Sequence, residues 1–139
     1  MRRGSGLTSS VVVFDTWAWW EVLHATPTGE QLAKKYLMAV DVRLLTPDLA
    51  LAETSAKLAR EGRADEIARA LNVMERASEV VPITRKAAEA CGALLGKLRQ
   101  TDRNAGLADS VMLAIAREEG AVLISGDRCF RGERDVRDD

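Results

Sequence analysis

Residues 11–15 of this chain read VVVFD. Four consecutive apolar residues, three of them β-branched, are typical of a short strand that is buried on both faces, as in a parallel sheet. An acid follows where the strand would leave the sheet. A carboxylate placed against a core carries a desolvation cost, and a bound cation is a common compensation. The stretch therefore predicts a buried strand whose carboxyl end carries function.

Apolar runs of the same kind recur along the chain and alternate with helical patterns. Further strands are predicted at 42–46, 80–83 and 121–125, and Val136 is the candidate for a last short strand. Helices are predicted at 16–24, from the Thr26-Pro27 break onward, and at 47–62, 64–79, 84–98 and 107–119. Short apolar strands joined by helical crossovers favour a parallel sheet that is covered on both faces. The predicted fold is a three-layer α/β/α sandwich with a short, mainly parallel central sheet.

The composition fits one soluble domain. The chain has 139 residues, of which 47% are hydrophobic and 29% charged. We expect a disordered tail over residues 1–10 and a single domain over 11–139. Neither a signal peptide nor a membrane-spanning run is present in the pattern, so we expect a cytoplasmic protein that does not bind membranes. A net charge of −1 argues against a highly basic nucleic-acid binder but does not exclude a nuclease.

Four acids stand where an apolar or neutral residue would be expected. Asp15 and Asp127 follow predicted strands, and Glu53 and Asp109 lie inside Ala/Leu-rich helical stretches. Functional groups gather at the carboxyl ends of strands in such sheets, and four converging carboxylates suit Mg²⁺ or Mn²⁺. Each acid also has a structural interpretation. Asp15 could cap a helix, Asp109 could favour a helix dipole, Asp127 could belong to a Gly-Asp turn, and Glu53 could lie on a helix surface.

Four segments together resemble the PIN domain, a ribonuclease family, and within it the VapC toxins of toxin–antitoxin pairs. They are the segments Val12 to Thr16, Thr46 to Glu53, Gly106 to Ala116 and Val122 to Phe130. Each segment is a weak signal by itself, but their order and spacing make the set fairly specific. The resemblance covers the chain from Val11 to Phe130. It departs from the family's pattern at Ser110, where the family often has alanine.

The resemblance implies an endoribonuclease that hydrolyses RNA phosphodiester bonds with one or two Mg²⁺ or Mn²⁺ ions. Asp15, Glu53, Asp109 and Asp127 would be its catalytic and metal-binding residues. Thr16 and Ser125 match the hydroxyl positions that support those carboxylates. The resemblance also implies a cognate antitoxin protein as partner, and pairing into a homodimer is common in such domains.

Further candidate contacts with RNA or a partner protein are suggested only by the position of residues in the sequence. Arg103, Asn104 and Arg128 sit beside two of the acids in the sequence and could hold RNA phosphates. Three tryptophans, at 17, 19 and 20, make the first helix aromatic, and we expect one face to join the core and the other to be exposed. The tryptophan side chains could pack in the core or in a dimer interface, bind the antitoxin, or stack on RNA bases, and the sequence does not decide among these roles. The only histidine, His24, is expected on a helix away from the acids.

Three alternatives differ in function. A receiver-type phosphoacceptor needs a second acid near Asp15 and a lysine after the late strand, where Arg128 follows Asp127 instead. A haloacid-type phosphohydrolase needs Asp-x-Asp, which Asp15-Thr16-Trp17 does not provide. A catalytically silent PIN-like module that binds protein or RNA stays open. Two cysteines, Cys91 and Cys129, are expected as free thiols rather than a disulfide or a zinc site.

Overall fold

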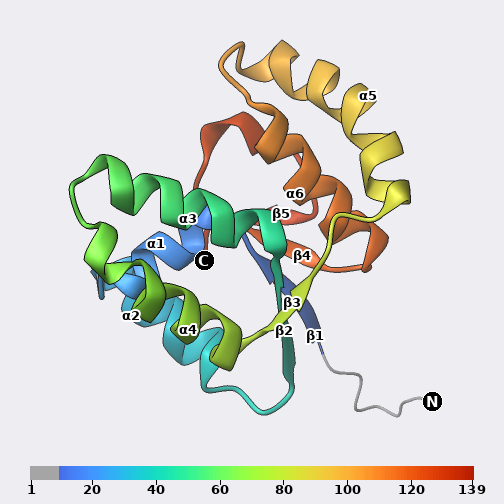
Figure 1. The fold of residues 1–139 in the computed structure, drawn as a ribbon. Helices are drawn as coiled ribbons and strands as arrows, with labels where there is room; N and C mark the ends of the chain where they lie inside the picture. Colours follow the sequence, from blue (N-terminus) through green and yellow to red (C-terminus); the bar gives the residue numbers. More distant parts are fainter. Residues whose placement is uncertain (1–9) are drawn as a thin grey trace.

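The computed structural model describes residues 10–139 (Figure 1). Residues 1–9 of the expected tail lie outside the described residues, and Ser10 is already the first residue of a strand. The strands are β1 (Ser10–Phe14), β2 (Val42–Pro47), β3 (Glu79–Val81), β4 (Val122–Ile124) and β5 (Val136–Arg137). They form one sheet in the order β3-β2-β1-β4-β5, and every pairing is parallel. The parallel sheet and its last short strand are therefore confirmed.

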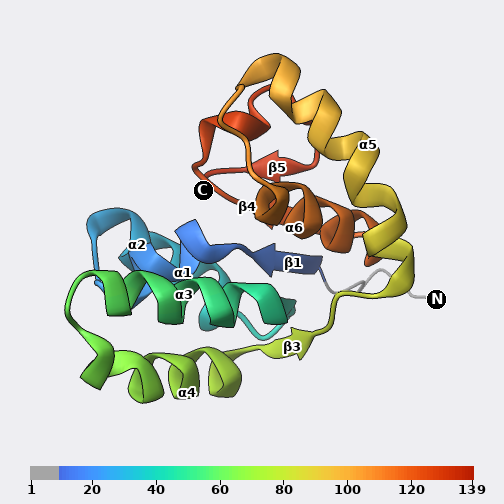
Figure 2. The same cartoon turned by 45° about the horizontal axis from the view of Figure 1, so that its top comes forward.

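The helices cover this sheet from two sides. They are α1 (Thr16–Leu23), α2 (Pro27–Leu32), α3 (Asp48–Arg60), α4 (Ile67–Ala77), α5 (Arg85–Thr101) and α6 (Leu107–Glu118), with short turns η1 (Ala33–Leu37), η2 (Ala64–Glu66) and η3 (Arg128–Phe130). Helices α1 to α4 gather on one side of the strands and α5 with α6 on the other (Figure 1). Figure 2 shows the same separation from another angle. The predicted α/β/α sandwich is confirmed.

Strand β1 lies at the centre of the sheet, and its side chains lie at the centre of the core. Val13 and Phe14 are fully buried. The ring of Phe14 meets the rings of Trp19 and Tyr36 edge-on, with centroids 5.2 and 5.7 Å apart. Edge-to-face pairs of this kind add to the stability that burial supplies. The apolar run that predicted the strand is therefore also the central packing element.

A chain of buried polar contacts ties α1 to the sheet. The indole N–H of Trp19 donates to Thr46 Oγ1 at 2.9 Å, and Thr46 Oγ1 lies 2.6 Å from Ser78 Oγ. Ser78 in turn donates to the carbonyl of Met74. Buried polar groups are costly unless they are paired, so this chain holds α1 against β2 in one position. That position matters because α1 begins directly after Asp15.

Several element boundaries differ from the prediction, among them those of β3 and α4. Strand β3 covers Glu79–Val81 and ends before Pro82, so Ile83 is not part of it. Proline has no N–H to donate to the ladder, which accounts for the early end. The helix predicted over 64–79 begins as the 3₁₀ turn η2 and continues as α4 to Ala77. No helix in residues 10–139 is long and apolar enough to cross a bilayer.

Candidate active site

The carboxyl ends of β1 and β4 lie next to each other. Phe14 pairs with Ile124, and the N–H of Asp15 reaches the carbonyl of Ile124 at 3.4 Å. In chain order the sheet grows from β1 to β2 and β3 on one side, and then to β4 and β5 on the other side of β1. Where the direction of growth changes, between β1 and β4, a crevice forms outside the carboxyl ends of the strands, and α/β sheets bind ligands in such crevices. Asp15 and the segment from Ser125 to Asp127 both lie at this crevice.

Asp15 is the N-cap of α1 and is almost completely buried. Its Oδ1 accepts a hydrogen bond from the N–H of Ala18 at 2.9 Å. Burial raises the pKa of Asp15 to about 7, although the Ser125 hydroxyl and the Ala18 amide favour its charged form. The negative charges of Asp127 and Asp109 raise this pKa further. The expected helix cap is real, but a cap alone does not need a buried carboxyl among other acids.

Glu53 reaches the same crevice from the second turn of α3. Its Oε1 accepts a hydrogen bond of 2.6 Å from the hydroxyl of Thr16, the first residue of α1. Glu53 is half-buried. Thr16 therefore orients Glu53, and its role in supporting a metal site stays a prediction.

Asp109 and Asp127 approach each other from α6 and from the start of η3. Asp109 Oδ2 accepts from the N–H of Gly106 at 2.8 Å, and Asp127 Oδ1 accepts from the N–H of Cys129 at 3.2 Å. Ligand atoms of Asp109, Asp127 and Cys129 lie within 4.8 Å of one another. Desolvation, and then the charges of Asp127 and Glu53, raise the pKa of Asp109. Burial and the two acids also raise the pKa of the Cys129 thiol.

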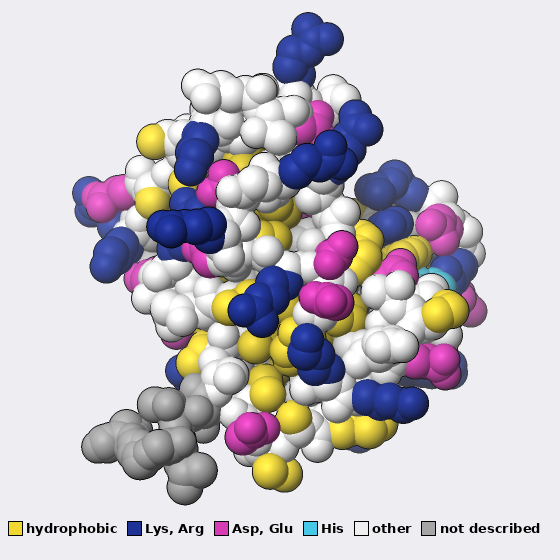
Figure 3. All heavy atoms as spheres, turned by 180° about the vertical axis from the view of Figure 1, so that it is seen from behind, with side chains coloured by type: hydrophobic (Ala, Val, Ile, Leu, Met, Phe, Trp, Pro, Cys, Tyr) yellow, Lys and Arg dark blue, Asp and Glu magenta, His cyan; other side chains and the backbone are white. Residues whose placement is uncertain are grey.

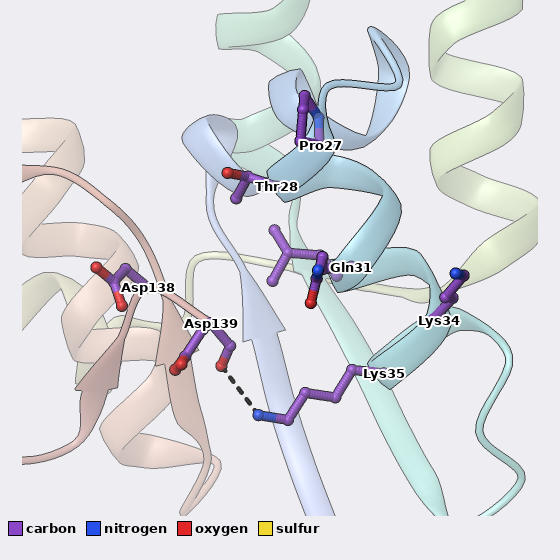
Figure 4. A pocket seen from close by; sticks show the side chains of 8 residues that line it. Pro27, Thr28, Gln31, Lys34, Lys35, Asp138 and Asp139 are labelled. Carbon is purple, nitrogen blue, oxygen red and sulfur yellow. Dashed lines mark hydrogen bonds between the residues drawn. The ribbon is translucent and has the colours of Figure 1, made fainter.

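All four acids line one cleft of about 430 Å³. Its walls are Asp15, Thr16, Trp17, Trp20, Glu21, Glu53, Ala56, Lys57, Arg60, Asp109, Met112 and Asp127. A larger cavity, of about 630 Å³, lies between α2, η1 and the segment at Asp138 and Asp139 (Figure 4). There Lys35 Nζ contacts the Asp139 carbonyl at 3.4 Å, and none of the four acids takes part. The chemistry therefore gathers in the smaller cleft.

The donor set of the cleft fits a hard divalent cation. Each acid has one oxygen oriented by a hydrogen bond from the chain, from Ala18, Thr16, Gly106 or Cys129. A carboxylate has two oxygens, so an oriented group of this kind can still bind a metal ion. Burial, and to a smaller extent repulsion from the other acids, raises the pKa of Asp15 and of Asp109, and a cation would counter both effects. Oxygen donors favour Mg²⁺ or Mn²⁺ over softer metals.

The remaining site predictions have different outcomes. Ser125 is buried, and its hydroxyl accepts from the N–H of Asp127 at 3.1 Å, next to Asp15. The structure does not bring Arg103, Asn104 or Arg128 into the cleft. Arg128 instead points to Asp102, with Nε 3.5 Å from Oδ2. A phosphate-binding role for these three residues stays a prediction.

Two cations that sequence reasoning missed line the cleft instead. Lys57 and Arg60 follow Glu53 by one and two turns of α3. Residues four and seven apart share a helix face, and this spacing was the signal that could have identified them. Figure 3 shows the molecule from behind, relative to Figure 1. On this face basic and acidic side chains are interspersed, and the basic ones do not form one continuous area.

The tryptophans divide between the core and the cleft. Trp19 is fully buried, whereas Trp17 and Trp20 are half-buried and line the acidic cleft. The face expected to be exposed is therefore part of the candidate site. His24 is half-buried at the end of α1, where its Nδ1 contacts the Trp20 carbonyl and its Nε2 contacts Arg63, each at 2.8 Å. Its ring is thus engaged away from the acids, as expected.

Comparisons with known proteins agree with this geometry. A family model described as "PIN domain" matches residues 12–132. No match is found among the curated proteins. Among solved structures, VapBC2 from Rickettsia felis, bound to a DNA fragment from its promoter, has a TM-score of 0.71 at 16% identity, covering 91% of this chain and 96% of that chain. VapC20 of Mycobacterium tuberculosis, described as a sarcin–ricin loop cleaving toxin, has a TM-score of 0.67 at 20% identity, covering 91% and 98%.

A toxin–antitoxin complex from Klebsiella pneumoniae also matches, with a TM-score of 0.67 at 19% identity over 90% of this chain and 94% of that one. At such identities the likeness establishes the fold. The family model covers most of the chain and includes all four acids of the cleft. With the parallel sheet in the order β3-β2-β1-β4-β5, this match shows that the chain belongs to the PIN domain family.

Proposed function

We propose that this protein is a metal-dependent endoribonuclease and the toxin of a type II toxin–antitoxin pair. The observation that carries the proposal is the convergence of Asp15, Glu53, Asp109 and Asp127 on one cleft of a PIN domain. A fold that used these acids only as caps and turn residues would not need them together, because their charges repel one another.

The four acids would hold Mg²⁺ or Mn²⁺, with Asp15, Asp109 and Asp127 as direct ligands and Glu53 in direct or water-mediated contact. Such an ion lowers the pKa of a bound water and stabilises charge on the scissile phosphate. The chain's own contribution is orientation. Thr16 donates to Glu53, and the backbone N–H groups of Ala18 and Gly106 donate to Asp15 and Asp109.

No side-chain base other than these acids is required. His24 contacts Arg63 and the Trp20 carbonyl rather than the cleft. Trp17, Trp20 and buried Met112 form part of the cleft wall, whereas Asp127 is exposed. Electrostatic interactions among the buried and half-buried acids are stronger than they would be at an open surface.

The partners in this proposal follow the similar structures. The Rickettsia felis structure is of VapBC2 with promoter DNA, and the Mycobacterium tuberculosis protein is described as cleaving the sarcin–ricin loop. By analogy, we propose a cognate antitoxin and an RNA substrate for this chain. We also propose a homodimer and a cytoplasmic location, as the sequence led us to expect. A catalytically silent module is the alternative. It would bind RNA or protein through the same cleft without cutting.

Cleavage of a mixed RNA pool by purified, partner-free protein tests the proposal. Reactions contain Mg²⁺, Mn²⁺ or EDTA, with Asp109→Asn in parallel. Asp65→Asn, which changes an exposed acid on η2, is the matched control. We expect metal-dependent cutting by the wild type and by Asp65→Asn, and none by Asp109→Asn. Equal cutting by Asp109→Asn would contradict the assigned site, and a folded wild type that binds RNA without cutting it would favour the silent module.

A further inference from the structure

Several arginines in the described part of the chain are already paired. Arg43 contacts Glu79, Arg63 contacts Glu61 and Glu66, and Arg117 contacts Glu133 and Asp135. Arg85 and Arg128 also reach carboxylates, and Arg99 donates to the carbonyl of Ala105. Cations that are engaged in this way have fewer donors to offer a ligand.

Lys57 and Arg60 differ from these cations. Both line the acidic cleft, and neither side chain makes an ion pair or a hydrogen bond with any residue in 10–139. Lys57 follows Glu53 by four residues, a spacing at which the two would ordinarily pair on a helix. Glu53 Oε1 instead accepts from Thr16 at 2.6 Å. The ammonium group of Lys57 thus lines the same cleft as the acids without pairing with Glu53.

The side chain that holds Lys57 is Trp20. Lys57 Nζ lies 4.2 Å from the centroid of the Trp20 ring, a close cation–π contact. The Trp20 ring also lies 4.3 Å from the ring of His24, and Arg63 Cζ is 5.8 Å from it. An aromatic face attracts the ammonium charge but accepts none of its N–H donors as a carboxylate would. Lys57 is therefore positioned and still able to donate hydrogen bonds.

We propose that Lys57 and Arg60 form a phosphate-binding subsite for RNA, and that Trp20 is a positioning residue for Lys57. The inference rests on the proposed nuclease function and specifies how its substrate is held. A backbone phosphate next to the scissile one would contact α3, while the scissile phosphate lies at the acids. The RNA strand is then anchored on the α1–α3 side of the cleft, because on the β4 side Arg128 is engaged by Asp102.

The subsite also accounts for how an acidic cleft can accept a polyanion. With Glu21, five carboxylates line the cleft and repel RNA, and the two unpaired cations Lys57 and Arg60 offset part of that repulsion. The logarithm of the RNA-binding constant decreases linearly with the logarithm of the salt concentration. Each phosphate contact with a single strand adds about 0.7 to the magnitude of this slope. Loss of Lys57 or Arg60 therefore has a signature that a purely structural role would not produce.

Binding of a labelled single-stranded RNA by Asp109→Asn protein, measured at several salt concentrations, tests the inference. Lys57→Gln and Arg60→Gln are introduced singly and together into this background. Lys86→Gln, at an exposed lysine on α5, is the matched control. We expect each cleft substitution to weaken binding and to lower the salt slope by about 0.7, and the pair by about 1.4. The control variant should match its parent.

Trp20 is tested by coupling. Trp20→Leu should weaken RNA binding in the presence of Lys57 and add little when Lys57→Gln is already present. Trp20→Phe, which keeps an aromatic face, should retain most of the binding. In the metal-loaded active chain, Lys57→Gln should raise KM with a smaller effect on kcat. Additive effects of Trp20→Leu and Lys57→Gln would overturn the positioning role.

The outcomes separate this inference from the proposed function. Unchanged binding and salt slope in the double Lys57/Arg60 variant would overturn the subsite, and wild-type cleavage in Mg²⁺ would then leave the nuclease standing. Binding that depends on Lys57 without any wild-type cleavage would support the subsite and contradict the nuclease. A wild type that neither cuts nor binds RNA would overturn both.

Discussion

The hydroxyl of Thr16 donates a 2.6 Å hydrogen bond to Glu53, and this bond links the first residue of α1 to the second turn of α3. The two residues are far apart in the sequence but lie on the same wall of the cleft. The bond fixes one oxygen of Glu53 at the cleft, and Glu53 makes no ion pair with Lys57, its neighbour on α3. We expect loss of the Thr16 hydroxyl to change both the position of Glu53 and its contact with Lys57.

Replacement of Thr16 should therefore reduce cleavage without unfolding the chain. Thr16→Val keeps the shape but loses the donor, and changes in groups that orient metal ligands typically cost about 10- to 100-fold in affinity or activity. Thr16→Ser keeps the donor and should retain most of the activity. Metal titrations followed by cleavage rate measure the effect. Equal activity of the valine and serine variants would show that the hydroxyl does not orient Glu53.

The metal-free protein should lose stability as the pH rises towards 7. The pKa of Asp15 is about 7 in the folded chain and 3.8 without the fold, so between these values the folded state keeps a proton that the unfolded state has released. The unfolded state then binds fewer protons, and the free energy of unfolding decreases with rising pH. The raised pKa of Asp109 acts in the same direction. Denaturant unfolding in EDTA across the range between these two pKa values measures the slope.

Asp15→Asn is the control for that slope, because it cannot ionise. In EDTA, above the folded-state pKa of Asp15, the variant should be less sensitive to pH and more stable than the wild type, by a few kcal/mol at most. Added Mg²⁺ should stabilise the wild type and have little effect on the variant. If the free energy of unfolding had the same pH dependence in the two proteins, ionisation of the buried Asp15 carboxyl would not destabilise the fold.

Gly126 should not tolerate a side chain. A Cβ at this position would lie 2.4 Å from Cε2 and Cζ2 of Trp17, so the indole or the loop that carries Asp127 would have to move. Overpacking of this kind typically costs about 1–3 kcal/mol. We expect Gly126→Ala to lower cleavage, and Trp17→Leu to restore part of it in the double variant. Melting temperatures and cleavage rates of the single and double variants give the coupling.

Gly96→Ala is the matched control for that substitution. Gly96 lies within α5, and a methyl group added to its Cα would meet no atom within 4 Å. Alanine there should stabilise the chain by about 0.5–1 kcal/mol, because glycine is unfavourable inside a helix. If Gly126→Ala behaved like Gly96→Ala, the close packing of Trp17 against the loop would not matter for the site.

The sequence predicted the parts of this protein that depend on local pattern. The β-branched run before Asp15 and the apolar run before Asp127 both mark buried strands, and the ends of such strands meet at one sheet edge. The convergence of the two acids followed from that rule. Glu53 and Asp109 stood out as acids inside Ala/Leu-rich helical stretches, but a helix period alone does not say which face meets the crevice, and the family resemblance was needed to assign them to the site.

The substrate side of the site could not be predicted in the same way. Arg128 adjoins Asp127 in the sequence, but its side chain turns to Asp102. Lys57 and Arg60 share a helix face with Glu53, but the sequence does not show that this face meets the other acids. Their proximity to the acids depends on how α3 packs against α1, which is a tertiary contact. The position of Cys129 beside two carboxylates likewise depends on the turn of η3.

Cys129 should distinguish hard from soft metal ions at this site. Its Sγ lies within 4.8 Å of ligand atoms of Asp109 and Asp127, but burial and these two charges raise the pKa of the thiol. A protonated thiol is a poor ligand for Mg²⁺, so Cys129→Ala should retain Mg²⁺-dependent cleavage. Zn²⁺ and Cd²⁺ favour thiolate and can displace its proton, so they should inhibit the wild type at lower concentrations than the alanine variant. Inhibition titrations of both proteins against a fixed Mg²⁺ concentration measure the difference.

Cys91→Ala, which removes the thiol that does not lie beside Asp109 and Asp127, should behave as the wild type. Equal inhibition of the wild type and Cys129→Ala would exclude the thiol as a ligand, whereas loss of Mg²⁺-dependent cleavage in Cys129→Ala would show that it supports the acids themselves.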